Sequence, residues 1–222
     1  MRLRAAALAA WLIGAAAPVL AHDVAPLPAL DYEPPAPGTY TLHRIMAAPD
    51  GEVLDLDGRP QRLRTFTRER ITLLGFIYTT YIDPDGCPLA YRVFDALRTT
   101  VGASPDLRDK VRLVTLSFDP ERDTPAAMRA YAGTRTTERG LGVPWHFLTT
   151  RSSRALAPLL EGFGQDVRSP RGLSNARSRS ELSHVLKVFL IDRDGFVREV
   201  YSSTFLHPRT VLNDIETLVM NP

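Results

Sequence analysis

The strongest constraint on the fold is a nearly continuous apolar run at residues 71–79, followed shortly by the pattern of an amphipathic helix. A strand that is apolar along its whole length is covered on both faces, which is typical of central strands in α/β proteins. Pro88 suits the first turn of a helix that reaches about residue 100, and Leu89 and Val93 recur on one of its faces. The two patterns together predict a central strand with a helix packed on it.

The alternation of strands and helices continues along the chain. Asp-Gly pairs at residues 57–58 and 194–195 predict two hairpins, the first of them close to the start of the domain. Further strands are expected at residues 111–118, 145–148, 185–191 and 196–201, and further helices from residue 125, through 155–160 and at 210–220. The fold class is therefore α/β, with a mixed central sheet flanked by helices and an added N-terminal hairpin.

The N-terminal residues have the pattern of a secretion signal. Two arginines precede an apolar run at residues 5–17, which is shorter than the roughly 20 residues that a membrane-spanning helix needs. We expect residues 1–21 to be a signal peptide, residues 22–39 a proline-rich tether, and residues 40–222 the folded domain. The sequence thus predicts an exported, periplasmic protein, which an uncleaved signal would keep near the membrane.

Charge and cysteine content narrow the function classes. A formal net charge of +2, scattered along the chain, gives no reason to expect a nucleic-acid partner. Cys87 is the sole cysteine, so no intramolecular disulfide can form within this sequence. Its thiol either carries a function or is a small core residue. The sequence does not predict an oligomeric state.

Four segments and one histidine carry a family resemblance. In chain order they are FIYT at residues 76–79, DPDGCPL at 83–89, SFDPERDTP at 117–125, WHFLT at 145–149, and His184. They resemble the motifs of the Sco/SenC proteins over about residues 40–220. The resemblance implies a thioredoxin-like fold.

The resemblance also implies copper chemistry. In this family two cysteines and a distant histidine bind copper, and the proteins serve the copper centre of respiratory cytochrome oxidase or maintain its thiols. Cys87 and His184 match two of those ligands. The other cysteine is replaced, by Tyr81 when counted forward from the strand or by Asp83 when counted back from Cys87. Dithiol redox activity is therefore not expected to carry over.

The residues that remain suit copper. Thiolate sulfur favours Cu(I), and imidazole binds either Cu(I) or Cu(II). A position at the start of a helix would lower the pKa of the Cys87 thiol. Asp83, Asp85 or the Tyr81 phenol would be additional donors for Cu(II), although residues 83–86 also have the composition of a turn. Binding is expected to be weaker than with three family ligands.

Other polar residues have simpler interpretations. Asp119, Glu121, Arg122 and Asp123 are candidates to shape the site, although charged residues in a loop before a helix are usually capping and surface groups. His43, His146 and His207 share no spacing that would nominate a metal site.

Three functions follow from these features. The first is a copper-binding accessory protein that passes metal to a copper-enzyme apoprotein or another copper carrier by ligand exchange, without catalytic turnover. The second is a one-cysteine thiol oxidoreductase or peroxidase, in which Cys87 reacts and an external thiol completes the cycle. The third is an inactive scaffold that binds another protein.

Overall fold

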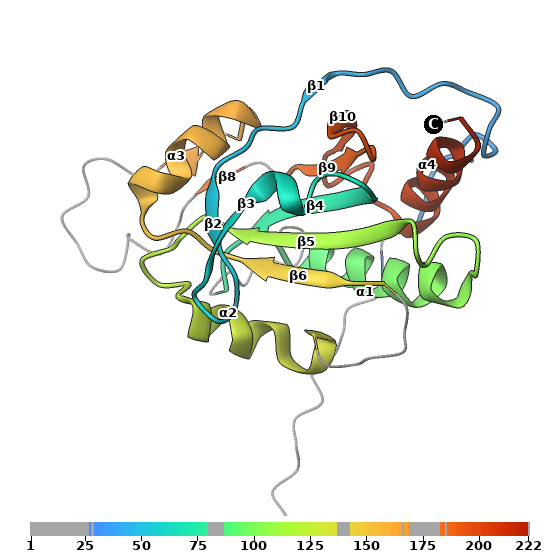
Figure 1. The fold of residues 1–222 in the computed structure, drawn as a ribbon. Helices are drawn as coiled ribbons and strands as arrows, with labels where there is room; N and C mark the ends of the chain where they lie inside the picture. Colours follow the sequence, from blue (N-terminus) through green and yellow to red (C-terminus); the bar gives the residue numbers. More distant parts are fainter. Residues whose placement is uncertain are drawn as a thin grey trace, which may run out of the picture.

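The computed structural model describes residue 27 and residues 29–79, 87–136, 143–165, 167–168, 183–184 and 186–221. Its central sheet has the strand order β1-β10-β9-β4-β5-β6 (Figure 1). The strands of this sheet are β1 (Met46–Ala47), β4 (Ile71–Ile77), β5 (Val111–Ser117), β6 (Trp145–Leu148), β9 (Val188–Ile191) and β10 (Phe196–Tyr201). Strands β4, β5 and β6 are parallel, and the other neighbours are antiparallel. The predicted mixed sheet is confirmed.

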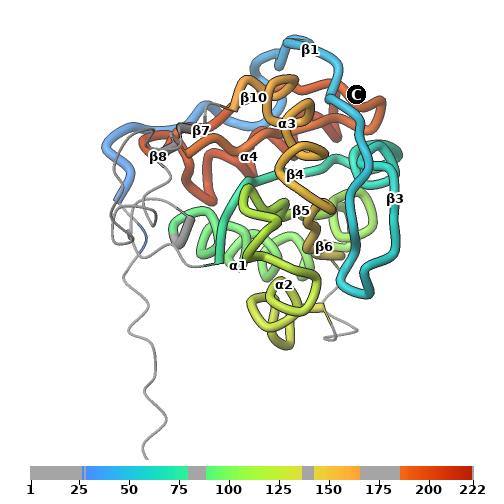
Figure 2. The backbone as a smooth tube through the Cα atoms, turned by 90° about the vertical axis from the view of Figure 1, so that its left-hand side faces the viewer, coloured from blue at the N-terminus to red at the C-terminus, as the bar shows by residue number. Residues whose placement is uncertain are grey.

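Helices cover both faces of the sheet. They are α1 (Cys87–Ala103), α2 (Pro125–Ala132), α3 (Ser153–Gly162) and α4 (Pro208–Met220), with short 3₁₀ turns η1 (Leu63–Thr65) and η2 (Gly133–Thr136). Figure 2 shows α1 and α4 on one side of the sheet and α3 on the other. This is the predicted thioredoxin-like arrangement.

Alternate residues of β4 explain these two layers. Gly75 faces α1, where an added Cβ would lie 3.1 Å from the Phe94 ring. Phe76 points to the opposite face and contacts Phe163 just after α3, with ring centroids 5.5 Å apart. Because both faces of β4 are covered, the whole strand is buried. This burial explains why its sequence is apolar without interruption.

The N-terminal hairpin pairs β2 (Glu52–Leu54) with β3 (Pro60–Arg62). Its turn is closed by Asp55, whose carboxylate accepts hydrogen bonds from the backbone N–H groups of Asp57 and Arg59. Gly58 has φ +73°, a left-handed conformation that glycine adopts without strain. A bridge between Leu54 and Thr149 places the hairpin beside the end of β6.

Two element starts differ from the predictions. Strand β9 begins at Val188, where pairing with both β4 and β10 starts, and not at residue 185. Helix α4 begins at Pro208, two residues earlier than expected, because Nδ1 of His207 accepts a hydrogen bond from the Arg209 N–H at 3.1 Å. A histidine cap of this kind is not among the usual helix-start signals.

The chain before the hairpin forms a strap, residues 29–47, whose first part lies along α4. It carries no helix or strand before β1. Its contacts with α4 include the Tyr32–Thr210 hydroxyl pair at 2.8 Å and a hydrogen bond from the Asn213 amide to the Pro35 carbonyl, also 2.8 Å. The C-terminal part of the predicted tether is thus held against the domain.

A buried carboxylate closes the strap onto the sheet. Asp214 of α4 accepts hydrogen bonds from the Tyr40 hydroxyl of the strap and, at 2.6 Å, from the Tyr201 hydroxyl of β10. Burial raises the pKa of Tyr40 to about 12, and the hydrogen bond to Asp214 adds to this shift.

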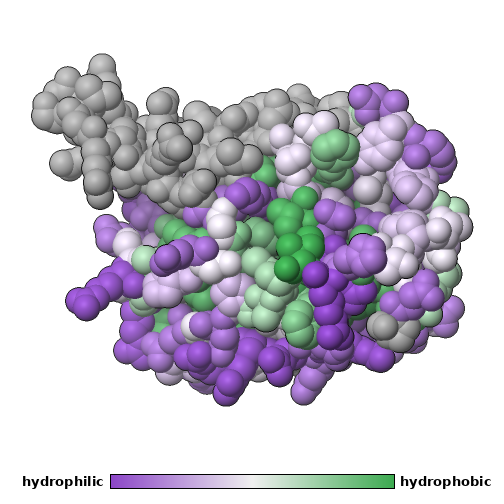
Figure 3. Space-filling model, turned by 90° about the horizontal axis from the view of Figure 1, so that it is seen from above, coloured by the Kyte–Doolittle hydropathy of each residue, from purple (hydrophilic) through white to green (hydrophobic). Residues whose placement is uncertain are grey.

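Figure 3 shows the face that carries β1 and α3, with apolar side chains gathered near its middle. Ile45 of the strap is 56% exposed.

Candidate metal centre

The two predicted copper ligands lie on separate elements. Cys87 is the first residue of α1, and His184 ends the short strand β8 (Ser183–His184), where it pairs with Val167 of β7 (Val167–Arg168). Figure 2 shows α1 and β8 toward the same side of the molecule. Tyr81, Asp83 and Asp85 lie outside the described residues. The ligand set therefore stays a prediction.

The scaffold that leads to Cys87 is well defined. Strands β4 and β5 are parallel, so their carboxyl ends meet, with Ile77 opposite Ser117. The Phe118 N–H continues this contact by donating to the Ile77 carbonyl at 2.8 Å. The chain thus leaves β4 and reaches Cys87 from a fixed starting point.

Asp123, two residues before the start of α2, bonds to the end of β4 and to the end of β5. Its carboxylate accepts hydrogen bonds from the Thr79 hydroxyl at 2.6 Å, from the Thr79 backbone N–H at 3.2 Å, and from the Ser117 hydroxyl at 2.6 Å. The residue is only 1% exposed. We call this group the Asp123 clamp: Thr79, Ser117 and Asp123.

The structure corrects the expectation for Asp123 and agrees with the expectations for the residues beside it. Asp123 was predicted to be a capping or surface group and is instead a buried acceptor, while Thr124 caps α2 by accepting from the Ala127 N–H. Asp119 pairs with the exposed Arg122 at 2.8 Å. Spacing alone could not separate these carboxylates, because the hydroxyl partners of Asp123 come from two other strands' ends.

The histidines are dispersed. His43 is exposed, and His207 caps α4. His146 of β6 packs against Phe66, with ring centroids 4.9 Å apart. Within the described part of the chain, no group of three or more His, Cys, Asp or Glu side chains is placed to hold a metal ion.

His146 is held neutral by its surroundings. Desolvation lowers its pKa to about 4, and the positive charges of Arg112 and Arg70 lower it further in the same direction. Because the folded state resists protonation, this histidine contributes stability that is complete above its unfolded pKa, about 6.5, and is lost as the pH falls toward 4.

A pH series tests this effect. Between pH 7.5 and pH 4.5 the wild-type protein should lose about 2 kcal/mol more unfolding free energy than His146→Gln, which cannot titrate. Urea denaturation at both pH values measures the difference, and His43→Gln is the matched control because that histidine is exposed. Equal losses of unfolding free energy in wild type and in His146→Gln would show that protonation of His146 does not destabilise the fold.

None of the described helices is long and apolar enough to cross a bilayer.

The SCO1/SenC family model matches residues 41–220. A search of curated proteins found no match.

Several solved structures share the fold at low identity. Apo Sco1 from Thermus thermophilus is 23% identical, with a TM-score of 0.61 over 82% of this chain and 95% of that chain. BsSco, described as a member of the Sco family of cytochrome c oxidase assembly proteins, is 20% identical, with a TM-score of 0.61 over 82% and 99%. Copper-bound ScoI from Bradyrhizobium japonicum is 21% identical, with a TM-score of 0.55 over 77% and 98%.

Proposed function

Because the chain belongs to the SCO1/SenC family, we propose that it is an exported copper-binding accessory protein that helps to assemble a respiratory copper enzyme such as cytochrome c oxidase. Copper is its cargo. The copper-bound ScoI structure and the assembly role given for BsSco support this proposal. The observation that carries it is the position of Cys87 as the first residue of α1, the helix that follows β4 in the chain, with the end of β4 held by the Asp123 clamp.

The donor chemistry of the chain fits this cargo. Cys87 supplies a soft sulfur donor, which favours Cu(I), and His184 supplies an imidazole, which binds Cu(I) or Cu(II). Helix α1 is 17 residues long, and unpaired N–H groups at the start of a helix stabilise a thiolate there. Tyr81, Asp83 and Asp85 are the candidates for oxygen donors when the cargo is Cu(II).

Ligand exchange is the proposed chemistry. A single cysteine cannot cycle between dithiol and intramolecular disulfide, so dithiol redox activity forms no part of the proposal. A site with few protein ligands leaves coordination positions open to a recipient. Copper would pass through transient shared coordination to a copper-enzyme apoprotein or another copper carrier.

Export is the second part of the proposal. Residues 1–21 would direct the chain to the periplasm, and an uncleaved signal would keep the domain beside the membrane. N-terminal sequencing of the protein from the periplasmic and membrane fractions tests this part. A start near His22 supports cleavage, whereas an intact Met1 in the membrane fraction supports tethering.

Anaerobic titration with Cu(I) against a competing chelator tests the copper site. The reduced wild-type protein should retain one equivalent, and Cys87→Ser and His184→Ala should each lose competitive binding. His43→Ala is the matched control, since this exposed histidine lies on the strap. Binding that survives Cys87→Ser would overturn the assigned ligand.

Absence of Cu(I) binding in the wild type would redirect attention to thiol chemistry. The same protein treated with hydrogen peroxide would then be assayed for a sulfenic acid at Cys87 and for reduction by an external thiol. A peroxide reaction without copper binding would favour the oxidoreductase, and neither activity would favour a binding scaffold.

A further inference from the structure

Three segments of the chain meet at the end of the central sheet where β4 and β5 begin. They are residues 68–70 before β4, residues 108–112 at the start of β5, and residues 192–194 after β9. The Ile71 N–H donates to the Lys110 carbonyl at 2.8 Å, and the Glu69 N–H donates to the Arg193 carbonyl, also at 2.8 Å. Backbone hydrogen bonds therefore hold the start of β4 between the other two segments.

Positive charge exceeds negative charge in these segments. Their six cations are Arg68, Arg70, Arg108, Lys110, Arg112 and Arg193. Two of their four carboxylates, Asp192 and Asp194, pair with arginines from elsewhere in the chain, Arg198 and Arg44, each at 2.8 Å. This leaves two carboxylates to balance six cations.

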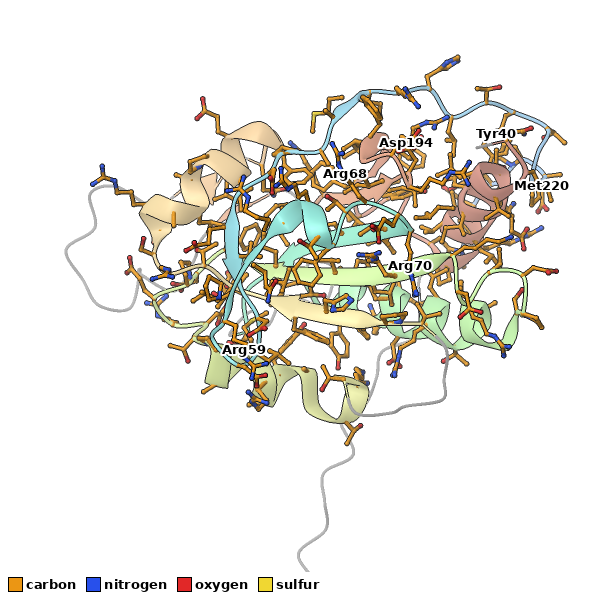
Figure 4. The ribbon with its side chains drawn as sticks, viewed as in Figure 1. Tyr40, Arg59, Arg68, Arg70, Asp194 and Met220 are labelled. Carbon is orange, nitrogen blue, oxygen red and sulfur yellow. The ribbon has the colours of Figure 1, made fainter. Side chains whose placement is uncertain are left out.

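Four of the cations form a surface that we call the basic end: Arg68, Arg70, Lys110 and Arg193. Arg70 is half-buried and the other three are exposed, and none of the four forms an ion pair within the described part of the chain. Figure 4 shows Arg70 beside the amino-terminal end of β5 and Arg68 nearer to Asp194. The basic end therefore has cations available to a partner.

A buried cation lies beneath this surface. Arg112 of β5 is 7% exposed, and its guanidinium donates to the backbone carbonyls of Thr65 and Arg68. Among the described residues it pairs with no carboxylate. A buried cation that is not neutralised adds to the positive potential of the surface above it.

The spacing of the basic end suits several carboxylates along one extended chain. Arg193, Arg70 and Lys110 lie at the ends of three neighbouring strands, in the order β9, β4 and β5. Three strands are about 10 Å across, and alternate residues of an extended chain are about 7 Å apart. A single carboxylate cannot span this width, whereas an extended segment with several acidic residues can.

The position of the basic end favours a protein partner over a lipid surface. The strap reaches α4 near its start, where Tyr32 contacts Thr210. Leu218, near the end of α4, lines a cavity together with Lys110 and Arg193. Because α4 has 13 residues and is about 20 Å long, a retained signal would bring the membrane to the other end of this helix.

From this arrangement we propose that the basic end binds an acidic, extended segment of a partner protein. Charge-assisted hydrogen bonds from Arg68 and Arg70 to its carboxylates would hold the segment. Cys87 follows the opposite end of β4, a strand of seven residues that is about 23 Å long. The partner would therefore bind whether or not the protein carries copper.

Binding of a fluorescein-labelled hexaglutamate peptide to the full chain, followed by fluorescence anisotropy at low ionic strength, tests the proposal. Arg68→Gln and Arg70→Gln should each weaken binding about tenfold, the size expected for one charge-assisted hydrogen bond. Glu69→Gln should tighten binding, because it removes a carboxylate between the two arginines. Arg154→Gln on α3 is the matched control, since that arginine is exposed and has no ion pair among the described residues.

The controls separate this site from general attraction and from lipid binding. Equal weakening by Arg70→Gln and Arg154→Gln would overturn the proposal, as would weaker binding by Glu69→Gln or equal binding of a hexalysine peptide. Vesicles of phosphatidylglycerol and phosphatidylcholine test the lipid surface. If Arg68→Gln and Arg70→Gln release the protein from these vesicles but leave peptide binding intact, the surface binds lipid and the proposal is wrong.

Discussion

Replacing Asp123 by alanine is expected to lower the free energy of unfolding by about 4 kcal/mol, because one buried and two part-buried donors would lose a charged acceptor together. Those donors are the backbone N–H and hydroxyl of Thr79 and the hydroxyl of Ser117. Asp123→Asn should cost about half as much, since the amide keeps one acceptor oxygen but turns an N–H₂ group toward donors.

Urea denaturation at neutral pH measures both changes. Glu121→Ala is the matched control: it removes a carboxylate from the same loop, but one that is exposed and bonded to Ser153 at the surface. That control should change stability by less than about 0.5 kcal/mol. Equal effects of Asp123→Ala and Glu121→Ala would show that the clamp does not stabilise the fold.

The second large effect is expected for Asp214→Ala, which should lower the free energy of unfolding by about 3 kcal/mol. The phenols of Tyr40 and Tyr201 would lose their shared acceptor, and Tyr201 is only 2% exposed, so water could not replace the carboxylate there. Adding Tyr201→Phe to Asp214→Ala should restore part of the loss, because it removes a buried donor that has become unpaired.

The strap gives this variant a local readout. Limited proteolysis should cut within residues 29–47 faster in Asp214→Ala than in wild type, since Tyr40 no longer fastens the strap to α4. Asp194→Ala is the control, because Asp194 forms an exposed ion pair with the strap residue Arg44. If both variants are cut at the wild-type rate, the Asp214 hydrogen bonds do not hold the strap.

Local signals in the sequence were sufficient for much of the fold. The two Asp-Gly pairs became turns in which Gly58 and Gly195 have positive φ angles, and the apolar run became the buried strand β4. Trp145–Leu148 and Phe196–Tyr201 begin and end where predicted. These features depend on residues within a few positions of one another, which is the range that a sequence pattern captures.

Features that depend on distant residues were not predictable. Asp123 has the composition of a helix-start loop, and its burial is set by Thr79, 44 positions earlier in the chain. His146 lacks a metal-site spacing, yet burial, and to a lesser extent the charges of Arg112 and Arg70, lower its pKa. The roles of Cys87 and His184 as copper ligands are predictions from the motif resemblance.

The Asp123 clamp also bears on how the proposed copper ligands can change during evolution. Thr79 belongs to the clamp, Cys87 is the first residue of α1, and seven residues of sequence separate them. The hydrogen bonds of the clamp involve only Thr79, Ser117 and Asp123, so a substitution between Thr79 and Cys87 replaces none of its members. A lineage could therefore lose or gain a proposed ligand in that stretch while selection on the clamp stays unchanged.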